Sequence, residues 1–115
     1  MLAVSPLAPK EYPTMPPIAG VRMVSAACGI RQKQREDLML MAFAEGTQIA
    51  GVFTQSKTAA APVTRSQQHL AGGYARALLV NSGNANAFTG EAGEQAVTAT
   101  LGSVSQLLDC EPEEC

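Results

Sequence analysis

The apolar residues of the chain fall into short runs separated by glycine, proline and polar residues. The first run, residues 21–27 (VRMVSAA), has β-branched residues and ends before Gly29, which predicts a strand and a turn. Residues 37–44 (DLMLMAFA) and 49–54 are apolar runs around Glu45-Gly46-Thr47, and they predict a hairpin of largely buried strands. Leucine and methionine would equally suit a buried helix, so that alternative stays open. Asp37 and Glu45, which bracket the first run, are expected to face solvent.

The second half of the chain changes from loop to strand to helix. Residues 57–62 (KTAAAP) predict a loop closed by proline, and residues 63–70 predict a short helix that stops near Gly72-Gly73. Residues 76–81 (RALLVN) form the clearest strand pattern and lead into NSGNANAFTG, which suits turns and left-handed torsions. Residues 90–109 are helical in pattern, and their apolar stripe requires a sheet to pack on. The stripe consists of Val97, Leu101, Val104 and Leu108.

The N-terminal end of the chain predicts an extended arm, and the C-terminal end suggests part of a larger fold. Residues 1–17 contain Pro6, Pro9, Pro13, Pro16 and Pro17 and predict an extended arm. Residues 18–115, with 46% apolar and 16% charged residues over the whole chain, predict one small α+β domain with helices packed on a mixed sheet. Because the sequence stops at EPEEC, directly after the long helix, we expect uncovered apolar faces or sheet edges and an incomplete fold.

Charge and cysteine content exclude several classes of protein. The net charge is -2, and Arg31, Lys33 and Arg35 have no aromatic neighbours on which bases could stack, so nucleic acid is not an expected partner. Cys28, Cys110 and Cys115 form no C-x-x-C pair, so a zinc site is not expected. Free thiols in a reducing compartment fit this pattern better. The prolines interrupt any signal-peptide run, and no window is apolar enough for a membrane helix, so a cytoplasmic protein without membrane contact is expected.

The turn before the long helix carries the most suggestive chemistry. A helix N-terminus presents unpaired N–H groups and the positive end of the helix dipole, and the Thr89 hydroxyl beside it adds a donor. Together these groups suit an oxyanion. The competing interpretation is that Thr89 is only an N-cap, with Glu91 and Glu94 placed favourably in the first turn.

Other sites are less well supported by the residue pattern. Gly90 is followed by Glu91 rather than by Lys and Ser or Thr, which excludes a phosphate-binding P-loop, and Ala85 breaks the dinucleotide fingerprint after Gly83. His69 is expected to lie on the surface at a helix end. Cys28 is expected to be a buried small apolar residue, and Ser82 a turn residue.

Specific motifs span most of the chain: GVRMVSAACGIRQKQREDLMLM (residues 20–41), AGVFTQSKTAAAPV (residues 50–63) and, above all, RALLVNSGNANAFTG (residues 76–90). In these segments the chain resembles the ornithine acetyltransferase family, which includes bifunctional glutamate N-acetyltransferases. The resemblance implies a DmpA/OAT-like α/β fold and a precursor that cleaves itself before a threonine. That threonine becomes the nucleophile of a β chain, in an assembly that is commonly α2β2.

The resemblance also implies the reaction and the site residues. Family members pass acetyl from N-acetylornithine to glutamate in arginine biosynthesis, and bifunctional members also use acetyl-CoA as a substrate; no cofactor is implied. The family's oxyanion hole is a Thr-Gly pair, which matches Thr89 and Gly90. Glu91 is an awkward neighbour for a developing negative charge unless its side chain points away. Gln55-Ser56 departs from the family pattern, and the nucleophile would lie beyond residue 115, so this chain alone is expected to be inactive. A small non-catalytic ligand-binding or assembly domain is the alternative.

Overall fold

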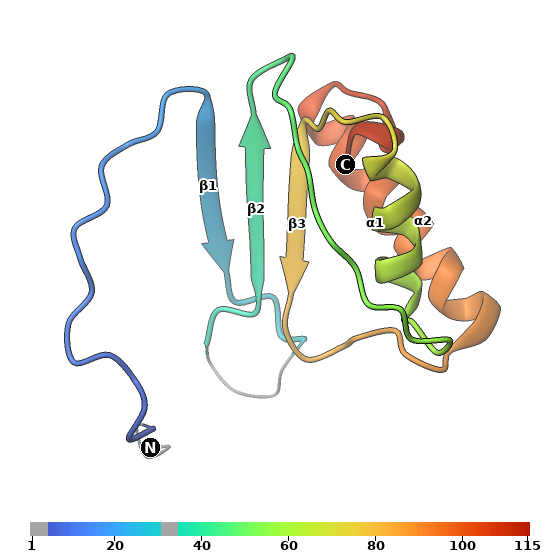
Figure 1. Cartoon of the computed structure of the whole chain (residues 1–115), viewed down its shortest axis with the longest axis horizontal. Coiled ribbons are helices and arrows are strands. Elements are labelled where there is room, and N and C mark those ends of the chain that lie inside the picture. The colour runs from blue at the N-terminus through green and yellow to red at the C-terminus, as the bar shows by residue number, and fades with distance from the viewer. Residues whose placement is uncertain (1–4, 31–34) are drawn as a thin grey trace.

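The computed structural model of the chain describes residues 5–30 and 35–115; Arg31 and Lys33 of the basic group lie outside the described residues. Residues 5–17 form neither helix nor strand and are largely exposed. The remaining part is an α+β arrangement of a sheet and helices, which confirms the expected class (Figure 1). In chain order its elements are β1 (Val21–Ala26), β2 (Leu38–Phe43), α1 (Ala61–Leu70), β3 (Ala77–Asn81), α2 (Gly90–Leu108) and a short 3-10 helix η1 (Pro112–Glu114).

The sheet has the strand order β1-β2-β3. Leu40 at its centre pairs with Val24 on one side and Leu79 on the other, and both pairings are antiparallel. The strands expected over residues 21–27, 37–44 and 76–81 are therefore confirmed, whereas the mixed pairing expected of the sheet is not seen in the described part of the chain. β2 is half-buried along its whole length.

The hairpin expected between residues 37–44 and 49–54 is wrong. Residues 49–54 form no strand, and a single bridge from Gln48 to Tyr74 is the only pairing described near them. Because β1 and β3 occupy both edges of β2, no edge of β2 remains for a third partner. Instead this segment descends beside the sheet, and α1 climbs back to the starting end of β3, which makes β3 antiparallel to β2 (Figure 1).

The helices lie beside β3 and pack against each other (Figure 1). α1 begins at Ala61, two residues earlier than expected, because Pro62 fits the first turn of a helix, where its missing N–H costs nothing. It ends before Gly72-Gly73, and α2 spans the expected residues. Val97 and Val104 of the α2 stripe are buried, together with three alanines that line this small core, Ala61, Ala75 and Ala77.

Apolar surface remains uncovered on the sheet and on α2. Met23 of β1 is 63% exposed and Leu107 of α2 is 71% exposed. A groove of about 630 Å³ lies between the sheet and α2, lined by Val24, Leu40 and Leu79 from the sheet and by Val97, Leu101 and Val104 from α2. The expectation of open apolar faces is confirmed: in the described part of the chain, α2 covers its face of the sheet only in part.

Asp37 and Cys28 both differ from their expected environments. Asp37 is 3% exposed, and its Oδ1 accepts the Cys28 N–H at 2.7 Å. Its main chain also joins neighbouring segments, because its N–H donates to Ala26 O and its carbonyl accepts the Ser82 N–H. Cys28 is exposed. The carboxylate therefore fixes the turn by hydrogen bonds, which hydropathy does not reveal, whereas Glu45 is exposed as expected.

Substituting Asp37 with asparagine should lower the free energy of unfolding by about 1 kcal/mol, because a neutral amide oxygen accepts a hydrogen bond more weakly than a carboxylate. Urea unfolding followed by far-UV circular dichroism measures this change. Glu45→Gln is the matched control and should stay within about 0.5 kcal/mol, since Glu45 is exposed. Equal effects of both substitutions would show that the Asp37 contact contributes nothing specific.

Candidate functional site

The turn between β3 and α2 is built from left-handed backbone torsions. Positive φ values occur at Gly83 (116°), Asn86 (47°), Phe88 (56°) and Gly90 (55°). Glycine and asparagine adopt these torsions at least cost, which confirms the expectation for the NSGNANAFTG segment. The torsions reverse the chain over a few residues, so that α2 begins close to the end of β3.

Asparagine side chains and main-chain groups hold this turn together. Asn81 Nδ2 donates to Asn84 O at 2.9 Å, and Asn84 Oδ1 accepts the Asn86 N–H at 3.2 Å. Asn86 O then accepts the Ala61 N–H at 3.4 Å and the Thr89 hydroxyl at 3.1 Å. The first residue of α1 and the residue before α2 therefore meet at one carbonyl oxygen. The N-terminal ends of both helices lie at the same end of the sheet (Figure 1).

Thr89 occupies the cap position of α2, but its hydroxyl makes no capping hydrogen bond. Its backbone has φ −99° and ψ −2°, whereas a capping side chain needs an extended backbone to reach the free amides of the first turn. The N-cap interpretation is therefore correct about the position of Thr89 before α2 and wrong about a capping hydrogen bond from its hydroxyl. The side chain is exposed, and its hydroxyl proton points to Asn86 O.

Gly90 and Glu91 form the first turn of α2. Gly90 is exposed, and as the first helical residue its N–H has no partner within the helix. The Glu91 carboxylate accepts a hydrogen bond from Gln95 Nε2 at 3.1 Å, one turn further along the helix. The carboxylate is thus directed along the helix surface toward the second turn, away from Thr89. Neither Thr89 nor Gly90 lines the apolar groove.

Gly93 belongs to the candidate site, although the sequence pattern did not single it out. It is buried one turn into α2, and a Cβ there would overlap Thr89 Oγ1 and lie 3.5 Å from Asn86 O. Only a glycine leaves room for the Thr89 hydroxyl in its present position. A glycine inside a helical pattern was the available signal, because such a glycine often marks a close approach.

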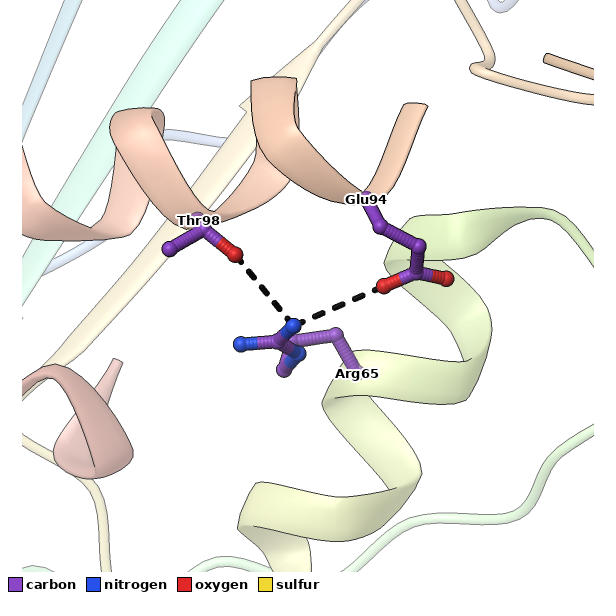
Figure 2. A network of polar contacts seen from close by, with 3 residues as sticks. All are labelled: Arg65, Glu94 and Thr98. Atoms are coloured by element: carbon purple, nitrogen blue, oxygen red, sulfur yellow. Dashed lines mark hydrogen bonds and ion pairs between the residues drawn. The ribbon is translucent and has the colours of Figure 1, made fainter. Parts of the chain in front are cut away.

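Arg65 links the two helices beyond the turn. Its Nη2 lies 3.5 Å from Glu94 Oε2 and 3.3 Å from Thr98 Oγ1, so one α1 side chain reaches two successive turns of α2 (Figure 2). The side chains of Arg65 and Glu94 are 26% and 46% exposed, which limits the pair to below about 1 kcal/mol. Its main effect is to keep α1 alongside the N-terminal half of α2.

The remaining candidates lie away from the turn or serve its backbone. His69 lies in the last turn of α1, as expected, but it is half-buried, and its Nδ1 is 3.0 Å from the main-chain oxygen of Cys115. Ser82 is a bend residue whose N–H donates to Asp37 O. Within residues 5–30 and 35–115, no three histidine, cysteine or acidic residues come together as a metal site would require. Of the helices in these ranges, none has the length and apolarity to cross a membrane.

Comparison with known proteins gives matches along most of the chain. The model of the ArgJ family matches residues 22–115. The chain is 52% identical over 107 residues to the arginine biosynthesis bifunctional protein ArgJ of Mesorhizobium japonicum, covering 93% of this chain and 26% of that protein. The ArgJ protein of Agrobacterium fabrum is also 52% identical, over 109 residues. The chain thus spans about a quarter of the length of these curated relatives.

Solved structures match in fold as well as in sequence. The ornithine acetyltransferase of Mycobacterium tuberculosis, solved in complex with ornithine, is 37% identical with a TM-score of 0.77, and the match covers 84% of this chain and 53% of that one. The ArgJ protein of Bacillus halodurans is 29% identical with a TM-score of 0.78, covering 84% of this chain and 50% of that one. Both matches support the DmpA/OAT-like arrangement implied by the sequence resemblance.

Proposed function

Since this chain belongs to the ArgJ family, we propose that it supplies the N-terminal part of an acetyltransferase of arginine biosynthesis, which moves acetyl from N-acetylornithine to glutamate. Its role in the reaction is to stabilise the oxyanion formed during acetyl transfer. The observation that carries this proposal is the pair Thr89 and Gly90, which is exposed at the N-terminus of α2 in a chain of this family.

The chemistry follows from the donors at this turn. A threonine outside this chain attacks the acetyl carbonyl carbon, and the carbonyl oxygen becomes negative in the tetrahedral intermediate. The Gly90 N–H donates to that oxygen, and the positive end of the α2 dipole adds a favourable field. The Thr89 hydroxyl has a single proton, which it donates to the Asn86 carbonyl oxygen 3.1 Å away. To stabilise the oxyanion, it gives up that hydrogen bond and donates to the oxyanion instead.

Glu91 does not oppose this role. A carboxylate aimed at the oxyanion would raise the energy of the intermediate by repulsion. The hydrogen bond between Glu91 and Gln95 Nε2 holds the carboxylate toward the next turn of the helix. The charge is also exposed to solvent, which screens it.

The rest of the enzyme is proposed to come from the sequence that the relatives have and this chain lacks. That sequence supplies the nucleophile, the substrate-binding residues and, after self-cleavage, the β chain of an α2β2 assembly. The uncovered apolar groove between the sheet and α2 supports this, because a folded enzyme would bury it. The cytoplasm is the proposed location, and acetyl-CoA is proposed as a second acetyl donor by analogy with bifunctional relatives.

A non-catalytic ligand-binding or assembly domain is not favoured as the alternative. The family match extends through the turn that carries Thr89 and Gly90, and the two relatives compared above are both ArgJ proteins.

A chimera tests the proposed function. This chain replaces the matching 107 residues of the Mesorhizobium japonicum relative, and acetyl transfer from N-acetylornithine to glutamate is assayed. We expect turnover by the chimera, with the unmodified relative as the positive control, and none by the isolated 115 residues. A chimera that folds and cleaves itself but transfers no acetyl would contradict the proposal. Turnover by the isolated chain would contradict its dependence on the missing sequence.

A further inference from the structure

The C-terminal segment, residues 110–115, brings two thiols together. Cys110 follows the end of α2, and its Sγ lies 3.7 Å from the Sγ of Cys115. The turn between them is closed by a reciprocal capping arrangement, in which the Glu111 N–H donates to Glu114 Oε2 at 3.0 Å. A disulfide requires sulfur atoms about 2.05 Å apart, so the two thiols need to approach by only about 1.7 Å.

This segment is held against the rest of the fold on both sides. The Arg76 N–H donates to Glu114 O at 2.7 Å, next to the start of β3. His69 Nδ1 at the end of α1 lies 3.0 Å from the main-chain oxygen of Cys115. Both thiols are half-buried, and the C-terminus lies beside α1 and α2 (Figure 1). The proximity of the thiols is thus maintained by contacts with β3 and α1, and not by the segment alone.

We propose that Cys110 and Cys115 form a reversible dithiol–disulfide site, whose oxidising substrate is a low-molecular-weight disulfide such as oxidised glutathione. This site is independent of the oxyanion-holding turn and of the proposed acetyl transfer. Cys28 is not part of it, because Cys28 is exposed and follows β1, at the end of the sheet away from the C-terminus (Figure 1).

The chemistry of the pair sets the order of the two exchange steps. Burial makes the largest contribution to a pKa of about 12 for the Cys115 thiol, and the hydrogen bond and charge interaction with Cys110 and the charges of Glu114 and Glu113 contribute in the same direction. Cys115 is therefore protonated at neutral pH and a poor first nucleophile. Cys110 attacks first. The mixed disulfide then lacks the Cys110 thiol that helped to raise the pKa of Cys115.

The two steps balance as follows. The Cys110 thiolate, after losing its proton to solvent, attacks one sulfur of the small disulfide and releases one small thiolate. Cys115 then loses its proton to solvent and attacks Cys110 Sγ, which forms the intramolecular bond and releases the second small thiolate. The protein loses two electrons and two protons, and the small disulfide is reduced to two thiols.

Oxidation would close the loop from Cys110 to Cys115 covalently. The bond would hold Glu114 O on the Arg76 N–H and the main-chain oxygen of Cys115 near His69, because both contacts lie on the same closed loop. Local opening of this segment would then become rarer. We expect slower exchange of the Arg76 amide hydrogen in the oxidised protein than in the reduced one.

Oxidised glutathione and intact-mass spectrometry test the proposal on the 115-residue chain in a Cys28→Ser background. The expected product has lost the mass of two hydrogen atoms, retains no glutathione and returns to the dithiol on reduction. With Cys115→Ser added, Cys110 should keep one glutathione as a stable mixed disulfide. Resolution of the mixed disulfide in the Cys28→Ser chain should accelerate up to about tenfold per pH unit between pH 7 and 9, since the thiolate fraction of Cys115 rises with pH.

Three results would overturn the proposal: a Cys28→Ser chain that retains glutathione on Cys110, one that forms only disulfide-linked dimers, or one that is not oxidised at all. Peptide mapping of the oxidised wild-type chain is an independent measurement that needs no variant. It should find residues 110 and 115 linked and residue 28 either free or glutathionylated. A link from Cys28 to either partner would contradict the assignment as well.

Discussion

Replacing Thr89 with valine in the active chimera is expected to lower kcat for acetyl transfer about 10²- to 10³-fold. Valine keeps the shape of threonine and removes only the hydroxyl donor. Loss of one oxyanion donor acts on the transition state and not on the bound substrate, so the KM for N-acetylornithine should change little. Steady-state kinetics with N-acetylornithine and glutamate measure both parameters.

Two controls separate this role from a structural one. Thr89→Ser retains the hydroxyl and should recover most of the activity, and the valine variant should cleave itself as the parent chimera does and lose little thermal stability. The hydroxyl is exposed and its hydrogen bond is to Asn86 O, so its loss should cost only about 1 kcal/mol of stability. A valine variant that turns over at the parental rate would exclude Thr89 from the oxyanion hole.

Gly93→Ala is expected to disturb the same turn by pushing against the Thr89 side chain. The added Cβ would overlap Thr89 Oγ1, so either the hydroxyl leaves Asn86 or α2 shifts. Such overpacking costs about 1 to 3 kcal/mol, and it outweighs the gain of up to about 1 kcal/mol that alanine brings to a helix interior. Amide hydrogen exchange over residues 86–97 of the 115-residue chain measures the loss, and kcat of the corresponding chimera should fall as Thr89 is displaced.

The partner of Gly93 can be identified by a double-mutant cycle. In a Thr89→Ala background the overlapping hydroxyl is gone, so Gly93→Ala should cost much less there, with a coupling of about 1 to 3 kcal/mol. Gly102→Ala is the matched control on the same helix, because a Cβ at Gly102 meets open space, and it should stabilise α2 slightly. Equal costs of Gly93→Ala with and without Thr89 would show that the contact with the hydroxyl is not what requires glycine.

The site itself was only partly predictable. The sequence placed Thr89, Gly90 and Glu91 at the start of a helix after a turn with left-handed torsions, and the structure has this arrangement. The direction of the Thr89 hydroxyl depends on the Asn86 carbonyl and on the missing Cβ of Gly93. The direction of the Glu91 carboxylate depends on Gln95. Side-chain directions of this kind follow from contacts that hydropathy and capping rules do not contain.

The sequence by itself determined the elements whose signals are local. β-Branched residues before Gly29 predicted β1, and the apolar run RALLVN before the turn segment predicted β3. The stripe from Val97 to Leu108 predicted α2, and the paired glycines predicted the end of α1. Local signals suffice there because a strand or helix is selected by the spacing of its own apolar side chains. The resemblance added the chemistry of Thr89 and Gly90, which spacing alone left as one of two interpretations.

Only the tertiary structure decided which segments meet. Residues 49–54 have the composition of a strand, but β1 and β3 already pair with both edges of β2. Residues 49–54 therefore form no strand hydrogen bonds with β2. The burial of Asp37 is compensated by the Cys28 N–H, nine residues away in sequence, which donates to its carboxylate. Cys110 lies close to Cys115 because contacts with Arg76 and α1 hold the C-terminal segment in place. In each case the partner is remote in sequence or set by the path of the chain. Competition for partners is a property of the whole fold and cannot be read from one segment.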